Sequence, residues 1–249
     1  MWTKSKIFSS KNKFTVNALK WHWVRFWMRF AGLSNIGRIA TRFASWFAPP
    51  HKASVAMAAM NPKGYIAPSA VISHANLRFG ANILIGDRVV IFQNKDGGFV
   101  EIGDRVQILR DTTIETGFGG SLSIGNSTSI HPRGQINAYK SSIEIGKSVE
   151  IAPNCAFYSY DHGLGLDKNI SEQPLESKGK IVVDDHAWLG VGVIVLSGVR
   201  IGKGAVVGAG SVVTHDIPDG GVAVGVPARV IKMREDIYQK NMNEKNRQG

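Results

Sequence analysis

Residues 183–213 read VDDHAWLGVGVIVLSGVRIGKGAVVGAGSVV. Aliphatic side chains occupy every sixth position of this stretch, at Val183, Leu189, Val195, Ile201, Val207 and Val213. A small or aliphatic residue follows each of the first five after four positions, at Ala187, Val193, Val199, Ala205 and Ser211. A period of six fits neither an α-helix nor a simple alternating strand, and it is typical of a solenoid of hexapeptides. We therefore predict triangular coils of about 18 residues, each with three short strands and three corners.

The same period extends toward the N-terminus and is interrupted once on a large scale. Isoleucines recur in the same role at Ile66, Ile72, Ile85, Ile91, Ile102, Ile108, Ile114, Ile124, Ile130, Ile136, Ile145 and Ile151. This pattern predicts an all-β solenoid, a parallel β-helix of about seven triangular coils. Between Phe157 and Val183 the chain spends far more than one hexad, which predicts an extruded loop over residues 158–182. Long loops on a regular scaffold often carry function.

These hexads, together with the turn GVPAR at 225–229, resemble the hexapeptide-repeat acyltransferases. That family includes the galactoside, maltose and serine O-acetyltransferases and polysaccharide O-acetyltransferases. The resemblance covers roughly residues 65–233 and implies a left-handed β-helix, a homotrimer and acetyl-CoA as co-substrate. No metal ion is expected, because the chain lacks the pair of loop histidines five residues apart seen in a zinc-dependent relative of this fold.

One histidine lies where the family places its catalytic base. The run IAPNCAFYSYDH at 151–162 has the family's register, which implies that His162 acts as the general base. Acyl transfer to a hydroxyl needs a base that is neutral near pH 7 and can hold a proton transiently. The resemblance also implies that Asn137 binds the acceptor hydroxyl. Asp161, adjacent to His162 in the sequence, is expected at the substrate-binding site, where it would orient or charge-stabilise the imidazole. We interpret the competing histidines His131 and His186 as exposed residues of the coil faces.

The donor site is implied on the C-terminal coils, in the groove between neighbouring subunits. Its residues by resemblance are Trp188, Val191, Ala209, Thr214, His215, Arg229 and Lys232. Small residues at the corners leave backbone amides open, and the two cations suit the nucleotide phosphates of coenzyme A. The single cysteine, Cys155, falls at a small corner position, which favours a buried spacer over a nucleophile and excludes an internal disulfide.

The N-terminal part is chemically distinct. Residues 1–86 contain twelve Lys or Arg and no Asp or Glu, whereas the remainder carries a net charge of −1. Aromatic and aliphatic residues at helical spacing predict two amphipathic helices, over about 19–30 and 36–47, with Ser34 or Asn35 capping the second. Two interpretations stay open: residues 1–50 bind an anionic membrane surface, or they cap the open end of the β-helix. The acid-free start also resembles a transit peptide, and no motif that reads nucleic-acid bases accompanies the charge.

The chain thus divides into three parts. Residues 1–60 form a helical segment with a linker beginning near 51, residues 61–231 the β-helix, and residues 232–249 a C-terminal helix and tail. The leading hypothesis is an acetyl-CoA-dependent O-acetyltransferase for a saccharide hydroxyl in cell-envelope or exopolysaccharide biosynthesis, located in the cytoplasm or peripherally on the inner face of the plasma membrane. A lipid-linked saccharide would fit that location. The alternatives are a small-molecule acetyltransferase (simple sugar, serine or antibiotic), N-acylation of a nucleotide amino sugar, and a catalytically silent scaffold.

Overall fold

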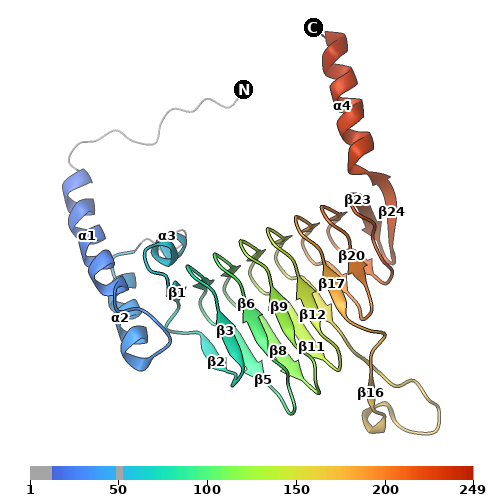
Figure 1. The fold of residues 1–249 in the computed structure, drawn as a ribbon, viewed down its shortest axis with the longest axis horizontal. Helices are drawn as coiled ribbons and strands as arrows, with labels where there is room; N and C mark the ends of the chain where they lie inside the picture. Colours follow the sequence, from blue (N-terminus) through green and yellow to red (C-terminus); the bar gives the residue numbers. More distant parts are fainter. Residues whose placement is uncertain (1–12, 49–52, 249) are drawn as a thin grey trace.

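The computed structural model describes residues 13–48 and 53–248, which form a three-sided β-prism with helices at both ends (Figure 1). Three parallel sheets make up its sides, and we call them sheets A, B and C in chain order. Each turn of the chain contributes one short strand to each sheet. The period of six explains this directly, because one aliphatic residue per side points inward and the backbone bends before the next side begins.

The strands of each sheet follow one another along the prism axis. Sheet A contains β1 (Tyr65–Ile66), β4 (Leu84–Ile85), β7 (Gln107–Ile108), β10 (Ser129–Ile130), β13 (Glu150–Ile151), β18 (Trp188–Leu189), β21 (Val206–Val207), β23 (Gly221–Gly225) and the antiparallel β24 (Ala228–Met233). Sheet B contains β2 (Val71–Ser73), β5 (Val90–Gln93), β8 (Thr113–Gly117), β11 (Gln135–Tyr139), β14 (Ala156–Tyr158), β19 (Ile194–Val195) and β22 (Val212–Val213). Sheet C contains β3 (Leu77–Phe79), β6 (Val100–Ile102), β9 (Leu122–Ile124), β12 (Ile143–Ile145), β17 (Ile181–Val183) and β20 (Arg200–Ile201).

The prediction of a triangular parallel β-helix of about seven coils is confirmed. Six coils have all three strands, and the seventh closes its third side through a bridge between Ile201 and Ile217. The predicted inward positions form continuous columns along the axis. On sheet A, for example, Ile108, Ile130 and Ile151 are in register and fully buried. Because every coil buries its aliphatic residues against the coils above and below, the prism has one contiguous core.

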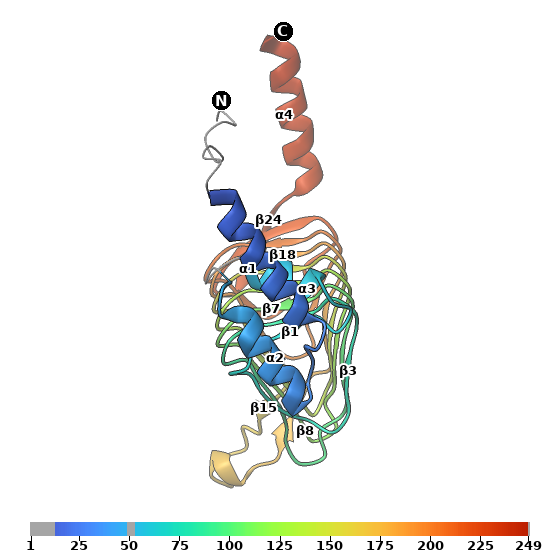
Figure 2. The ribbon, with the colours of Figure 1, turned by 90° about the vertical axis from the view of Figure 1, so that its left-hand side faces the viewer.

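Three helices close the N-terminal end of the prism, α1 (Lys13–Met28), α2 (Asn35–Ser45) and α3 (Ala53–Ala59). Figure 2 looks onto this end and shows α1 and α2 lying across it. The two helices predicted from the aromatic pattern are confirmed. The linker predicted to begin near residue 51 is wrong in part, because α3 occupies it and buries Ala53, Met57 and Ala58 in the cap. Alanine and methionine favour the helical conformation, and the apolar side chains of this segment are buried when it forms a helix in the cap.

Helix α2 is buried through a face of small residues, whereas α1 is buried through Val24 and Met28. In α2 the buried residues are Gly37, Ala40, Thr41 and Ala44. The predicted apolar stripe of the same helix points outward, with Ile36 75% and Trp46 69% exposed. Gly37 lies against the Gly32 backbone, where a Cβ would come within 2.6 Å, so this position of α2 has no room for a side chain. The capping interpretation is supported for the buried faces, and most of the aromatic stripes are left uncovered in this chain.

Ser34 is the N-cap of α2, as predicted, and its hydroxyl accepts a hydrogen bond of 3.1 Å from the Gly37 amide. We expect Ser34→Ala to destabilise this helix end by about 1 kcal/mol, because the amide loses its partner. Hydrogen exchange of the Gly37 and Arg38 amides should then be roughly fivefold faster. Ser45→Ala, which removes a hydroxyl at the other end of the same helix, is the control, and equal exchange in both variants would contradict the prediction.

The C-terminal end is closed by a strand that sequence analysis did not identify. Residues 228–233 form β24, which pairs antiparallel with β23 after the GVPAR turn. The predicted C-terminal helix is present as α4 (Arg234–Gln248), and it projects away from the prism (Figure 1). The predicted boundary at residue 232 therefore lies inside a strand, because the backbone of this segment completes the exposed edge of sheet A.

Candidate functional site

The extruded loop leaves the prism between β14 and β17, at the corner joining sheets B and C (Figure 1). Its base is a short antiparallel ladder of β15 (Asp161–His162) and β16 (Leu175–Glu176), and a 3-10 turn at Ile170–Glu172 lies beyond it. Gln173 holds the loop together, since its side chain accepts from the Gly165 amide at 2.7 Å and donates to the Gly165 carbonyl at 2.8 Å. The loop is thus an ordered projection.

His162 lies on β15 at the base of this loop, paired with Leu175 across the ladder. Its side chain is exposed, and the ring of Tyr160 meets it nearly edge-on with centroids 6.4 Å apart. Among the described residues none is hydrogen-bonded to the imidazole. Both ring nitrogens are therefore available to a ligand or to a second copy of the chain. A neutral imidazole in that position can accept a proton from a hydroxyl.

The carboxylate of Asp161 points toward the next coil and not toward His162. Its Oδ2 accepts a hydrogen bond of 2.8 Å from the Ser197 hydroxyl. Ser197 is buried at the following turn of the same corner. Asp161 thus ties the base of the loop to the prism, and in this chain it positions the segment that carries His162.

Asn137 lies one coil before the loop, on the outer face of sheet B. In the parallel register it is flanked by Glu115 of β8 and Tyr158 of β14. Its side-chain amide has no hydrogen-bond partner among the residues that the structure describes. Since neighbouring strands are about 4.8 Å apart, Asn137 and the start of the loop border the same patch of surface. The predicted acceptor residue is thus free to donate to and accept from a bound hydroxyl.

An aromatic cluster beside His162 escaped sequence analysis. Phe118, Tyr139 and Tyr160 lie on three successive coils at the corner of sheets B and C, with centroid distances of 5.9 Å and 5.2 Å between neighbours. The signal was present, because the three residues are spaced 21 positions apart. A spacing of one coil plus a short corner insertion does not stand out against the hexad pattern, so the recurrence was not recognised as one surface.

Tyr139 is held in place within this cluster by two polar neighbours. Its hydroxyl donates to Glu115 Oε2 at 3.0 Å and accepts from Asn94 Nδ2 at 2.9 Å. Burial raises the pKa of the Tyr139 hydroxyl, and the nearby Glu115 carboxylate adds to the rise. Burial likewise raises the pKa of Tyr160. Both hydroxyls therefore stay protonated at neutral pH and remain hydrogen-bond donors.

The predicted donor residues fall into two groups on either side of sheet B. Trp188, 54% exposed on β18, shares a row on the outside of sheet A with Val206, Val222 and Lys232. Val191 and Ala209 lie exposed at the corner that joins sheets A and B, and Arg229 lies on β24. Thr214 and His215 lie beyond β22, at the corner that carries the loop two coils earlier, and their side chains are 2.8 Å apart.

One copy of the chain does not bring all the predicted residues together. Sheet B separates Trp188 and Val191 from His162, because a strand of that sheet joins the two corners. Thr214 and His215 share the corner of His162, whereas the cations of β24 lie on sheet A. A site containing all of them requires a second copy whose sheet A side faces this loop.

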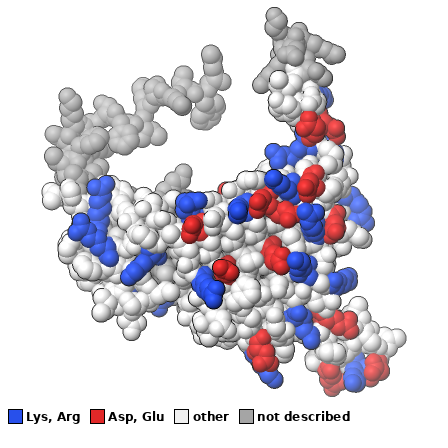
Figure 3. All heavy atoms as spheres, viewed as in Figure 1, with Lys and Arg blue, Asp and Glu red and all other residues white. Residues whose placement is uncertain are grey.

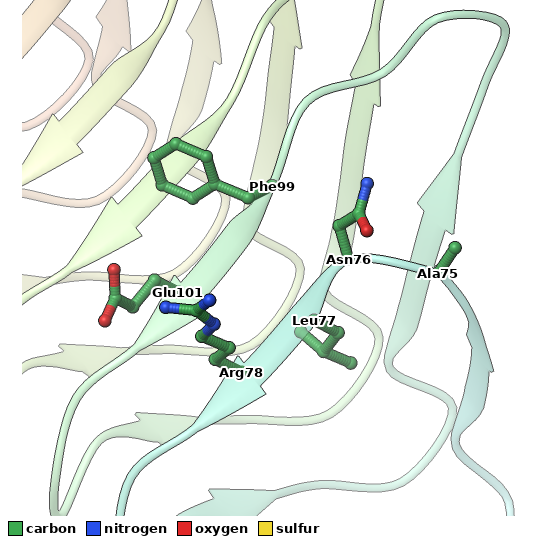
Figure 4. A pocket seen from close by; sticks show the side chains of 6 residues that line it. All are labelled: Ala75, Asn76, Leu77, Arg78, Phe99 and Glu101. Carbon is green, nitrogen blue, oxygen red and sulfur yellow. The ribbon is translucent and has the colours of Figure 1, made fainter.

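A further recess of about 400 Å³ lies on sheet C, near the other end of the prism. It is lined by Ala75, Asn76, Leu77, Arg78, Phe99 and Glu101. In Figure 4 the Arg78 and Glu101 side chains lie next to each other at the edge of this recess. These residues belong to the first two coils, whereas His162 lies in the loop of the fifth coil, so the recess is separate from the candidate site.

The residues that the structure describes contain neither a candidate metal site nor a membrane-spanning helix. Residues 13–48 and 53–248 contain no group of three or more His, Cys, Asp or Glu side chains arranged to hold a metal ion. Over the same residues, no helix is both long and apolar enough to span a bilayer.

The hexad repeat is similar in sequence to known bacterial transferases. Residues 180–215 match the family model for the bacterial transferase hexapeptide (six repeats). A segment of 57 residues is 56% identical to the galactoside O-acetyltransferase of Lactococcus lactis, covering 23% of this chain and 28% of that protein. A segment of 61 residues is 43% identical to the 2,3,4,5-tetrahydropyridine-2,6-dicarboxylate N-acetyltransferase of Staphylococcus aureus, covering 24% and 26%. The chain thus matches only about a quarter of the length of these two curated relatives.

Solved structures extend the similarity to most of the prism. A variant of AntD, an N-acyltransferase from Bacillus cereus solved with dTDP-4-amino-4,6-dideoxyglucose and coenzyme A, is similar with a TM-score of 0.53. Its sequence identity is 24%, over 68% of this chain and 90% of that one. The polySia-specific acetyltransferase NeuO is similar with a TM-score of 0.52 and 20% identity, over 68% and 82%. At these identities the two structures show the shared fold. The family model and the curated relatives confirm the resemblance to the hexapeptide-repeat acyltransferases, and residues 180–215 are a hexapeptide-repeat segment of the bacterial transferase type.

Proposed function

We propose that the protein is an acetyl-CoA-dependent O-acetyltransferase that modifies a saccharide hydroxyl, with His162 as the general base. The observation that carries this proposal is the exposed imidazole at the base of the long loop, one coil after an unpartnered asparagine side chain, on a prism with transferase-type hexads. The relatives support the reaction class, since those named above transfer acetyl or acyl groups.

The reaction needs only one proton to be moved twice. A neutral His162 nitrogen takes the proton of the acceptor hydroxyl, and the oxygen attacks the thioester carbonyl carbon. The C–S bond of the resulting tetrahedral intermediate then breaks, and the imidazolium returns the proton to the coenzyme A sulfur. Asn137 would orient the acceptor hydroxyl from the neighbouring coil. Tyr160, whose ring contacts the imidazole, would restrict its rotation.

The donor would bind against the C-terminal coils of a neighbouring copy. Ala209 and Val191 present open corners to an extended chain such as pantetheine, and Trp188 presents an exposed ring beside them. Arg229 and Lys232 would meet the nucleotide phosphates. Such an arrangement needs a homotrimer, or another ring of copies, in which each loop reaches the next prism. Coenzyme A is the ligand named for the similar Bacillus cereus structure.

The test is acetyl transfer by the full-length protein. We expect release of the coenzyme A thiol from acetyl-CoA only when a saccharide with free hydroxyls is present. The product should be about 42 Da heavier than the acceptor, and the turnover should be on the order of 1–100 per second. Hydroxyl sugars, nucleotide-linked amino sugars, serine and an aminoglycoside would be compared. Transfer only to the amino sugar would replace O-acetylation by N-acylation. A folded protein that consumes no acetyl-CoA with any of these acceptors would favour the silent scaffold.

The exposed faces of α1 and α2 further support a peripheral location at an anionic membrane, on the inner face of the plasma membrane. Large apolar side chains cover this surface: Leu19, Trp23, Phe26, Phe30, Leu33, Ile36, Ile39, Trp46 and Phe47. We call these residues the apolar platform. Exposed Lys20, Arg25, Arg29 and Arg42 surround it, and Figure 3 shows Lys and Arg without Asp or Glu over this end of the molecule.

A surface with this composition matches the interface of a bilayer. Aromatic rings insert at the depth of the headgroups, and arginines attract anionic lipids. Other side chains of these helices, including Val24 and Met28 of α1 and Ala44 of α2, already pack in the cap, so the platform is not needed to complete the core. A membrane-bound enzyme of this class would act on a lipid-linked saccharide. The contribution of residues 1–12 lies outside the described part of the chain.

A further inference from the structure

A row of aromatic rings leads along the prism to His162. From Phe118 the row passes through Tyr139 to Tyr160, and Tyr160 contacts the imidazole. Each ring comes from a different coil, so the row runs parallel to the axis and crosses three turns of the chain. Phe118 is 43% exposed, Tyr139 only 8%, and Tyr160 is half-buried. Tyr139 therefore forms a floor between two more accessible rings.

Packing and hydrogen bonds fix the orientation of the Tyr139 ring. Tyr139 lies so close to Gly117 that a Cβ there would come within 2.7 Å of its ring. Its hydroxyl is held by Glu115 and Asn94, as described above. A tyrosine needed only for core packing would not require a polar clamp at the surface end. The ring is instead fixed in one orientation, tilted by 40° against the ring of Phe118.

Polar groups border the row on sheet B. Tyr158 donates a hydrogen bond of 2.9 Å to the Gln135 side chain, and the unpartnered Asn137 amide lies between Tyr158 and Glu115 in the register. The surface thus combines aromatic faces with side chains that both donate and accept. A pyranose presents the same pair of features, with C–H groups on one face and hydroxyls around its edge.

We infer that Phe118, Tyr139 and Tyr160 form a binding track for an extended saccharide, whose terminal or penultimate unit reaches His162. This inference rests on the proposed function and adds that the preferred acceptor is an oligosaccharide or polysaccharide chain. The axial rise of one coil per ring suits a chain of sugar units, one following another, whereas a single sugar would contact only Tyr160 and Asn137. The weakly positive C–H groups of the sugar pack on the negative ring faces.

The test compares monosaccharides with tetrasaccharides of the same sugar, for glucose, galactose, N-acetylglucosamine and sialic acid. With the wild-type protein, kcat/KM should be higher for the tetrasaccharide of at least one pair. Phe118→Ala should lower that value by about 3- to 10-fold, the equivalent of one aromatic contact, and leave the monosaccharide value unchanged. Phe118→Trp should retain the preference. Phe99→Ala, which removes a similarly exposed phenylalanine from sheet C, is the matched control.

Equal values for both lengths in every pair, or a preference that survives Phe118→Ala, would overturn the track. If no sugar is acetylated, the proposed function fails, and calorimetric titration of the tetrasaccharides without donor judges the track by itself. Binding that weakens 3- to 10-fold in Phe118→Ala supports it, and no binding by the wild-type protein overturns it. Light scattering completes the test: a variant that changes the oligomeric state but not the affinity would assign Phe118 to a contact between copies and overturn the inference.

Discussion

Replacing His162 by alanine is expected to lower kcat for acetyl transfer by about 10²- to 10⁴-fold, the usual contribution of a general base. The imidazole is exposed and makes no hydrogen bond within the described chain, so its removal leaves no buried group without a partner. The fold and the affinity for coenzyme A should therefore remain unchanged. Steady-state kinetics at saturating acetyl-CoA, with circular dichroism and a coenzyme A titration on the same samples, would check this result.

The control is a second histidine that lies outside the candidate site. His131, on the corner after β10, lies 3.8 Å from Glu150, and His131→Ala should keep nearly full activity. If His162→Ala keeps more than about a tenth of kcat, the assignment of His162 as the general base is falsified, because a general base contributes at least about 10²-fold.

Replacing three residues of the apolar platform by serine is expected to weaken binding to anionic vesicles strongly. The residues are Phe26, Phe30 and Trp46, which are at least half exposed, so the change should spare the cap. Full burial of a large apolar side chain is worth about 1.5–3 kcal/mol, and roughly half of each side chain is still to be buried, so the partition coefficient should fall by about 50-fold or more. Sedimentation with vesicles of phosphatidylglycerol and phosphatidylcholine measures this directly.

Two comparisons separate platform binding from unspecific adhesion. Serine at Phe92, Phe99 and Phe118, which are exposed on the prism, should leave vesicle binding intact. Gln at Arg25 and Arg29 should weaken binding by roughly 30-fold, about 1 kcal/mol per charge, whereas Gln at the prism residues Arg105 and Arg133 should have little effect. A wild-type protein that stays in the supernatant with anionic vesicles would rule out the membrane role and leave the acyltransferase proposal untouched.

The helices illustrate what helical spacing can and cannot predict. The periodicity of Phe26, Phe30 and their neighbours correctly predicted two helices and the Ser34 cap. It did not predict which face is buried, because the usual rule sends the most apolar face inward. Here α2 buries its small residues, because Gly37 meets the Gly32 backbone and has no room for a side chain, and most of the bulkier stripe is left outside.

The candidate site was likewise predicted only in part from the sequence. The long break after Phe157 identified the loop, and family register identified His162 and Asn137, because both signals are read along the chain. The bond from Ser197 to Asp161 and the ring contacts of Tyr139 were not predicted. Such contacts depend on how residues of different coils line up, and short insertions at the corners shift that alignment.

The sequence by itself determined the solenoid, its coil number and the position of its single large loop, since a period of six is repeated locally and each coil is stabilised by its neighbours. Only the tertiary structure decided that Phe118, Tyr139 and Tyr160 form one surface next to His162, and that the helices turn their aromatic faces outward. The physical reason is the stacking of the coils. It brings together residues about 20 positions apart, and the N-terminal helices close its end with one face each, while most of their large aromatic side chains stay outside.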